Sequence, residues 1–392
     1  MKLTAIGSGY FRVFKDGIEV SKHTSEREAI EAAVNLEDAA PTASVTYKHD
    51  YEVKVESEVT TAPVPPTTST PVVPSAGQFY APGSFWYEDI QQKPIHAMSS
   101  AWVAKLKWAK VTANGAGINI YDDGKPIYFA DANTPKVKVK LVGAWSAGNR
   151  NDLILQQGVR VPNGARPSGG TDHHLCVRDT VDDIEYNFHG CSFDWTTGVL
   201  TATDAGILYG ASKSDGTMEK RNDGWNSATA GFIPLAGGVF RVDKDGKILK
   251  PGTCIAMALN GYATLKGSPL WPCKASDGAS TDADAVPEGA RFRFKKNIVI
   301  DPAWAPITKL LVEEIRDHGL LVMDKTGSAF TFFIEDPTQY GFTSDKAIKE
   351  PWMDWAQPAF LVPYLGGKMP YKIFGDANNT GEFPLDQLEA VA

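Results

Sequence analysis

Cysteine is scarce and long apolar runs are missing from this chain of 392 residues. None of its four cysteines belongs to a C-x-x-C pair, so we expect no zinc knuckle. We interpret them as buried free thiols, with Cys176–Cys191 or Cys254–Cys273 disulfides as the alternative. A membrane-spanning helix needs about 20 consecutive apolar residues, and a secretory leader needs an apolar core near the N-terminus. The sequence has neither, so we expect no membrane insertion and no signal peptide.

Positive charge is also in short supply. The formal net charge is −8, which disfavours nucleic-acid binding because that requires a basic surface. Lys136, Lys138 and Lys140 alternate with apolar residues, a pattern typical of the solvated face of an amphipathic strand. The glycine-rich segment 231–238 lacks the lysine and hydroxyl pair of a phosphate-binding loop. We therefore expect no nucleic-acid partner and no cofactor.

Proline and threonine concentrate in one segment, EVTTAPVPPTTSTPVVPSAG at 58–77. Proline fixes φ and removes a backbone donor, so this run cannot form a helix or a central strand. It predicts an extended, semi-rigid spacer. We divide the chain into a small module (1–57), a linker (58–78) and a large body (79–392).

The N-terminal module predicts a β-hairpin–α–β fold. Asp16-Gly17 is a turn signal within the hairpin at 10–20. A capping-box spacing and apolar residues at helical intervals predict a helix over 25–34. Strict alternation over 45–56 predicts one long strand that pairs with the hairpin. So small a module is marginally stable alone, so we expect it to dock onto a partner or to form a homo-oligomer.

The body is dense in short strand signals separated by turns, such as the alternating RFRF at 291–294. Turn signals every ~8–12 residues favour a β-sandwich or jelly-roll-like body. One strong helix is predicted at 307–318, where apolar residues share one face and His318-Gly319 ends the helix. The predicted fold class is therefore mainly β.

The richest polar cluster begins at Asp172 and His174 and continues through Glu185 to His189. These residues are candidates for acid–base catalysis in a glycan cleft. The alternative is a polar loop with one histidine satisfied inside the fold. Asp182 and Asp183 offer the hard oxygens that calcium prefers, although no calcium-loop motif surrounds them.

Ten tryptophans are present, and aromatic rings can stack on sugar rings. Most will belong to the core, because aromatics dominate β-sandwich interiors. Trp195 and Trp225 adjoin polar residues, so we predict an exposed ligand site that includes Asp194 and Asn226.

The body, from about 84 to 352, resembles a mostly secreted bacterial β-rich family of unknown activity. The segments that carry the resemblance are SFWYEDI (84–90), IYFADANTPKVKVKL (127–141), HLCVRD (174–179), GWNSATAGFIPLAGGVFRV (224–242), EGARFR (288–293) and GLLVMD (319–324). Two positions depart from the family pattern: Met257 stands where it carries histidine, and Asn187 where it carries glutamate. If either lost group is catalytic in the family, the resemblance implies a non-catalytic relative here.

The N-terminal module resembles the front segments of phage virion and tail-associated proteins. Together with the layout, this resemblance favours a virion accessory protein of the tail-fibre, head-fibre or decoration type. It would be made in the host cytoplasm, contact other virion proteins through the module and display a body that binds a host-surface glycan. The alternative is a polysaccharide-degrading enzyme, either a depolymerase or a glycoside hydrolase.

Overall fold

The computed structural model describes residues 78–113, 116–143, 153–219, 226–342, 361–365 and 382–392, and the backbone of five strands before them. The chain divides into two compact units, Met1–Thr70 and Pro71–Ala392, and the division falls within the predicted spacer. That spacer up to residue 77 and the predicted helix at 25–34 lie outside the described residues.

The N-terminal unit contains the predicted hairpin, formed by β2 (Phe11–Lys15) and β3 (Ile18–His23). β4 (Val45–His49) pairs with β2, as predicted, and places Tyr47 opposite Val13. The expectation of one strand over 45–56 is wrong, because β5 (Glu52–Glu56) is separate and pairs with β1 (Lys2–Ile6). The alternation runs through both strands, so periodicity alone could not reveal the division.

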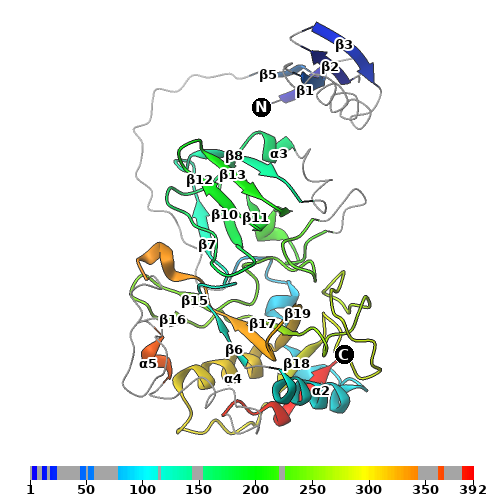
Figure 1. Cartoon of the computed structure of the whole chain (residues 1–392), viewed down its shortest axis with the longest axis vertical. Helices are drawn as coiled ribbons and strands as arrows, with labels where there is room; N and C mark the ends of the chain where they lie inside the picture. Colours follow the sequence, from blue (N-terminus) through cyan, green and yellow to red (C-terminus); the bar gives the residue numbers. More distant parts are fainter. Residues whose placement is uncertain are drawn as a thin grey trace. The chain divides into compact units, whose positions relative to one another are not determined.

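The body is mainly β, and two of its sheets, each with four strands, pack in a sandwich (Figure 1). Alternate residues of β11 face opposite ways: Tyr186 and Phe188 enter the core between the two sheets, while Glu185 and Asn187 point to the other side. The outer sheet has the order β12 (Ser192–Asp194), β13 (Val199–Ala202), β8 (Lys136–Leu141), β9 (Val159–Arg160). The inner sheet has the order β14 (Asp204–Tyr209), β11 (Ile184–His189), β10 (Leu175–Asp179), β7 (Ile127–Ala130).

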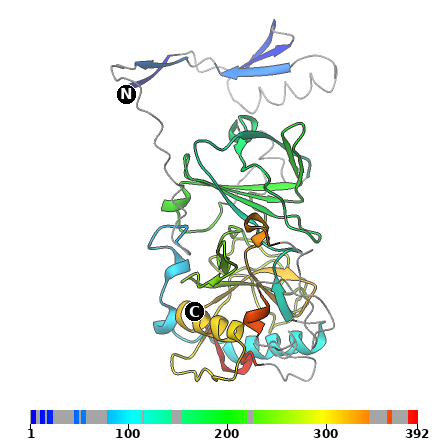
Figure 2. The same ribbon diagram turned by 90° about the vertical axis from the view of Figure 1, so that its left-hand side faces the viewer.

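A six-stranded mixed sheet forms the next layer, and the helices lie on its far side from the sandwich (Figures 1 and 2). Leu321 and Met323 of this sheet share a core with residues beneath the sandwich, whereas Leu320 and Val322 face the helices. The strand order is β21 (Leu388–Val391), β18 (Arg291–Phe294), β19 (Leu320–Thr326), β17 (Ile255–Asn260), β20 (Phe330–Phe333), β6 (Ala116–Asn119).

Two helices longer than one turn occur in the described part of the chain. The predicted helix is confirmed as α4 (Pro306–His318). The expectation of a single notable helix is wrong, because α2 (Ser99–Thr112) buries Trp102 and Leu106. Trp108 and Val111 of α2 are exposed, so its apolar residues form no single stripe that would have predicted it. No described helix is long and apolar enough to cross a membrane.

The smaller elements connect these layers: 3-10 turns (Phe85–Tyr87, Ile90–Gln92, Ala211–Lys213, Pro337–Tyr340, Leu385–Gln387), short helices α3 (Leu153–Gln156) and α5 (Val362–Leu365), and a ribbon of β15 (Arg241–Val242) and β16 (Ile248–Leu249). Two further expectations are confirmed. The alternating lysines of β8 lie on its exposed face, and all four cysteines are buried free thiols.

Trp86 packs against a glycine pair in the core beneath the sandwich. A Cβ on Gly237 would lie 2.3 Å from Cζ2 of the Trp86 indole, which has no exposed surface. We expect Gly237→Ala to lower the free energy of unfolding by about 1–3 kcal/mol, because overpacking forces neighbours out of their rotamers. Gly117→Ala is the matched control, since a Cβ there meets no atom within 4 Å. Equal denaturation midpoints for both variants would contradict this packing.

Candidate functional site

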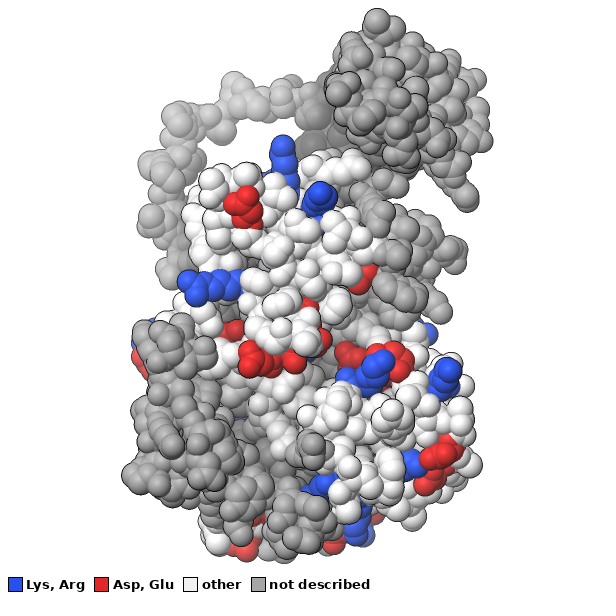
Figure 3. All heavy atoms as spheres, in the orientation of Figure 1, with Lys and Arg blue, Asp and Glu red and all other residues white. Residues whose placement is uncertain are grey.

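A polar cleft opens where the six-stranded sheet meets the inner sheet of the sandwich. It consists of two adjoining pockets of about 420 and 530 Å³ that share Asp172, Asp324 and Lys325. The first pocket extends along the ends of β17 and β20, and the second along the start of β10 and the end of β11. Acidic side chains gather in a band across the middle of the body (Figure 3).

A β-bulge in β19 directs Asp324 into this cleft. Met257 pairs with Val322, but the next residue, Ala258, pairs with Asp324, so Met323 is the extra residue. Ala258 lines the cleft, whereas Leu259 belongs to the helix-side core. Side chains alternate strictly along a strand, so without the bulge Asp324 would face that apolar core. Bulges often re-aim side chains in this way next to functional sites.

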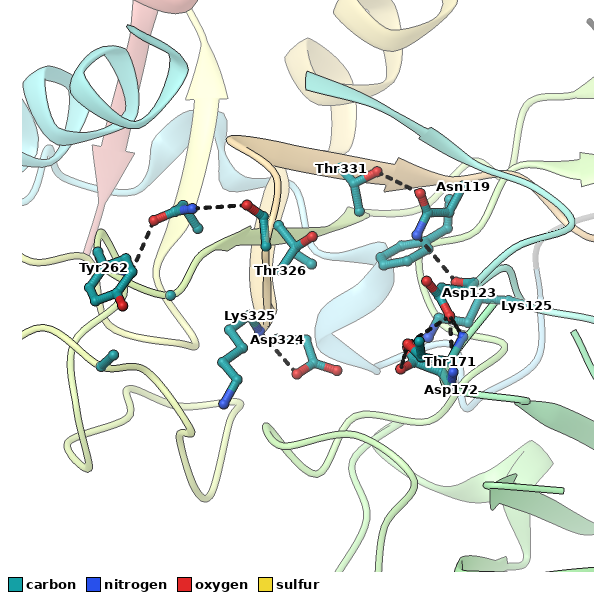
Figure 4. Close-up of a pocket in the computed structure, with 16 residues that line it drawn as sticks. Asn119, Asp123, Lys125, Thr171, Asp172, Tyr262, Asp324, Lys325, Thr326 and Thr331 are labelled. Atoms are coloured by element: carbon teal, nitrogen blue, oxygen red, sulfur yellow. Dashed lines mark hydrogen bonds between the residues drawn. The ribbon is translucent and has the colours of Figure 1, made fainter. Parts of the chain in front are cut away.

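Asp123 fixes the loop that carries Asp172. Its Oδ1 accepts hydrogen bonds from the backbone N–H groups of Thr171 (2.6 Å) and Asp172 (2.9 Å). Gly170 permits this contact, since its φ is +78° and a Cβ there would lie 2.3 Å from the same oxygen. Asp172 itself remains accessible, with a side chain that is 41% exposed. Figure 4 shows Asp123, Thr171 and Asp172 on one side of the first pocket, Tyr262 on the other, and Asp324 and Lys325 between them.

His174 is locked as a neutral imidazole at the cleft floor. Its Nε2 lies 3.2 Å from the Ala228 carbonyl oxygen, which only accepts, so Nε2 carries the proton. Its Nδ1 therefore accepts from the Lys125 ammonium at 3.0 Å. Burial, reinforced by Lys125 and His189, holds the pKa of His174 well below its usual value. His174 thus positions Lys125 and does not exchange protons near neutral pH.

Lys125 is a buried cation against the first pocket. Its ammonium lies 4.6 Å from the centre of the Phe333 ring, within the range of a cation–π contact. Burial lowers its pKa, an effect opposed chiefly by the carboxylates of Asp324 and Asp172. The lysine supplies positive charge at the floor of a cleft whose walls are acidic.

Asp324 and Glu288 hold protons unusually tightly. Burial, followed by repulsion from Asp277, raises the pKa of Asp324 to about 7. Burial, followed by repulsion from Asp324, raises the pKa of Glu288 to about 10. Asp324 can therefore act as a proton donor or acceptor near neutral pH, the range in which acid–base catalysts operate.

A histidine–aspartate pair lines the other pocket. The Nδ1 atom of His189 lies 3.5 Å from Oδ2 of Asp204, and this partner raises the pKa of His189. The two histidine rings are 5.6 Å apart between centroids. The two cleft histidines therefore differ, since the pKa of His189 is raised by Asp204 and that of His174 is lowered by burial.

The buried Glu288 carboxyl gives the body a distinctive pH dependence. Its raised pKa keeps it protonated in the folded state up to about pH 10, while the unfolded chain loses this proton at about pH 4. The folded state therefore binds the extra proton, so stability falls as pH rises through this window. We expect Glu288→Gln, which stays neutral, to flatten the decline of the melting temperature between pH 5 and 9. Parallel curves for the variant and the natural chain would refute this assignment.

The structure brings Asp172 and His174 together but places Glu185 elsewhere. Glu185 points beneath the sandwich, where it accepts a hydrogen bond from the Tyr80 hydroxyl at 3.2 Å. Burial raises its pKa, and it has no exposed surface. It lies on the strand face opposite Tyr186, so it braces the core, and the described cleft lining does not include it.

The aromatic site predicted around Trp195 is not assembled in the described residues. Trp195 is 40% exposed and packs on Phe193 beside the outer sheet. Asp194 caps the adjoining turn by accepting from Thr197, which lowers its pKa. Asn226 is buried, and its side-chain amide accepts from the backbone N–H of Ile207 and donates to the carbonyl oxygen of the same residue. Trp225 lies outside the described residues.

The predicted calcium ligands have other partners. Asp182 accepts from the Arg160 guanidinium at 2.5 Å. Asp183 accepts from the backbone and hydroxyl of Ser212. Within the described ranges, no group of three or more His, Cys, Asp or Glu residues has a geometry suited to a metal ion.

His189 belongs to the polar cluster predicted from the sequence, whereas sequence reasoning missed Lys125, Asp324 and Asp204. Asp324 carried a usable signal, since it ends an apolar run within the resemblance segment GLLVMD. The two positions at which the body differs from the family that it resembles lie away from the cleft. Met257 belongs to the helix-side core, and the Asn187 side chain accepts from the Leu235 backbone at 2.6 Å. Neither substitution removes a group from the cleft.

No known family model, curated protein or solved structure matches this chain. The interpretation of the cleft therefore rests on its own chemistry. Its lining combines carboxylates, amides and hydroxyls with one strongly exposed aromatic ring, Tyr262, at 72% exposure.

Proposed function

We propose that the body binds a glycan in the cleft between its six-stranded sheet and the inner sheet of the sandwich. The observation that carries this proposal is the lining of the two joined pockets. Sugars present many hydroxyls together with apolar ring faces, and the cleft offers the accessible side chains of Asp172 and Lys325 as hydrogen-bonding groups and Tyr262 as a stacking surface. A drug-sized ligand occupies a cavity of about 300–1,000 Å³, so pockets of this size suit short sugar chains.

We further propose that the whole protein is a bacteriophage virion accessory protein. A small β-rich unit, a proline-rich spacer and a larger body with a polar cleft suit attachment at one end and display at the other. The resemblance of the first unit to front segments of virion proteins supports the same layout. In this proposal the N-terminal unit contacts other virion proteins, and the body meets a host-surface glycan.

A reporter fused to residues 1–57 tests the attachment step. The fusion should co-purify with phage particles assembled in its presence, while the same reporter fused to residues 79–392 should not. Incorporation of the body fusion alone would reverse the assignment of the attachment unit.

Hydrolysis of the bound glycan is the second candidate, and the raised pKa of Asp324 favours it. Glycosidases pair a protonated carboxyl with an ionised one across the scissile bond. Here Asp324 would donate its proton to the departing glycosidic oxygen, and Asp172 would accept a proton from the attacking water. One water is consumed for each bond broken, and two new chain ends appear.

The binding proposal is tested with purified body (79–392) on an array of defined oligosaccharides. The natural chain should bind a restricted set of glycans, and Tyr262→Ala should weaken that binding by up to roughly tenfold, because one aromatic stacking contact contributes about 0.5–1.5 kcal/mol. Tyr209→Ala is the matched control, since Tyr209 is also exposed but lies outside the cleft lining. Equal effects of the two variants, or no glycan bound at all, would contradict the proposal.

A further inference from the structure

The two pockets meet at a shared centre and are not separate sites. Asp172, Asp324 and Lys325 line both of them. Asn260 and Tyr262 lie only in the first pocket, whereas His189 and Thr229 lie only in the second. A ligand that fills both pockets must therefore pass the Asp172–Asp324 pair in its middle and not at its end.

The size of each half calls for a chain rather than a single sugar. Cavities of about 420 and 530 Å³ each fall in the range that holds a drug-sized ligand. A ligand confined to one half would leave the polar lining of the other half unused. The shape of the cleft thus fits an extended polymer with sugars on both sides of the carboxyl pair.

The excess of acidic side chains in the lining favours uncharged polysaccharides over acidic ones. The joined pockets contain two lysines, Lys125 and Lys325, and five aspartates: Asp123, Asp172, Asp204, Asp277 and Asp324. Lys325 is already paired with Asp277 at 3.0 Å, and Lys125 donates to His174. An acidic polysaccharide would place its carboxylates against like charges, which disfavours binding.

We propose that the cleft takes an uncharged glycan chain that threads through both pockets and crosses the Asp172–Asp324 pair internally. This inference rests on the proposed glycan-binding function and adds the class of glycan and its mode of binding. If the cleft hydrolyses its ligand, the same arrangement cuts within the chain and releases products several sugars long.

Two alanines allow each half to be blocked separately. Ala279 lines only the first pocket and Ala230 only the second, so Ala279→Trp and Ala230→Trp each place an indole in one half. Thermal unfolding of both variants confirms that they fold. The probes are neutral and acidic oligosaccharides of two to eight sugars on an array, bound by the purified body.

Threading predicts that affinity rises with chain length for neutral oligosaccharides, and that each tryptophan variant weakens the longest chains by at least about tenfold. Binding only to acidic glycans, or to terminal sugars with no length dependence, would overturn this inference but leave the proposed function standing. Unchanged long-chain binding in either folded variant would also overturn it. Binding to no glycan would overturn both. The length series uses the natural chain, so it decides the matter even if a variant fails to fold.

Discussion

Replacing Arg241 by alanine is expected to lower the free energy of unfolding of the body by about 3–5 kcal/mol, because it leaves the buried carboxylate of Glu335 without its cationic partner. Glu335 has no exposed surface and binds the guanidinium in two places, with Nε–Oε2 at 2.6 Å and Nη2–Oε1 at 3.1 Å. The guanidinium also lies 5.1 Å from the Phe79 ring and 5.2 Å from the Phe129 ring. This pair therefore joins the first residues of the body to β7 and β15. Chemical denaturation of residues 79–392 measures the loss.

Two variants make the Arg241 experiment decisive. Lys244→Ala removes an exposed lysine paired with Asp245, and such surface pairs contribute little, so its midpoint should match the natural chain. Arg241→Met combined with Glu335→Leu should cost less than the sum of the two single changes, because neither charge is left unpaired. Additive losses would show that the two side chains do not act as a pair.

If the body hydrolyses its glycan as proposed, replacing Asp324 by asparagine is expected to reduce that hydrolysis by about 10²–10⁴-fold, the usual contribution of a general acid. Release of reducing ends from a glycan that the body binds is the measurement. Asp245→Asn is the matched control, since it makes the same change in an exposed turn. Binding of the same glycan by Asp324→Asn, with cleavage lost, separates catalysis from recognition.

The pH dependence of the cleavage rate is a second test of Asp324 as the general acid. Because its pKa is raised to about 7, the protonated form required of an acid persists at mildly acidic pH and disappears above neutrality. Cleavage should therefore fall as pH rises through 7. A rate that stays constant or rises from pH 6 to pH 8 would exclude Asp324 as the acid.

Much of the fold could be predicted from local patterns. The hairpin of β2 and β3, the strands β8 and β18 and the helix α4 follow from alternation, turn residues and one apolar stripe. The sequence could not reveal α2, because its apolar residues are distributed around the whole helix and form no single face. It also could not reveal the break between β4 and β5, because the alternation continues across it. Sheet order depends on contacts between distant residues, so local periodicity does not contain it.

Only some of the residues that line the cleft could be predicted from the sequence. Asp172 and His174 stood out because they are polar and only two positions apart, but Glu185, which is near them in sequence, faces a different layer. Asp324 reaches the cleft only through a bulge, and Lys125 reaches it through the pairing of His174 with its ammonium. Proximity along the chain therefore predicted Glu185 as a third site residue, which is wrong. The fold instead brings Lys125 and Asp324 to the cleft from about 50 and 150 positions away in the sequence.

Hydrogen exchange with and without a bound oligosaccharide tests most directly whether the cleft is the ligand site. The body should be saturated with the neutral chain that binds most tightly on the array, and backbone exchange followed by mass spectrometry. Slower exchange should be confined to segments that line the cleft, near 171–174, 227–230, 260–262 and 324–327. Protection centred on the turn after Asp194, or on the exposed Trp271, with the cleft unchanged, would contradict this account.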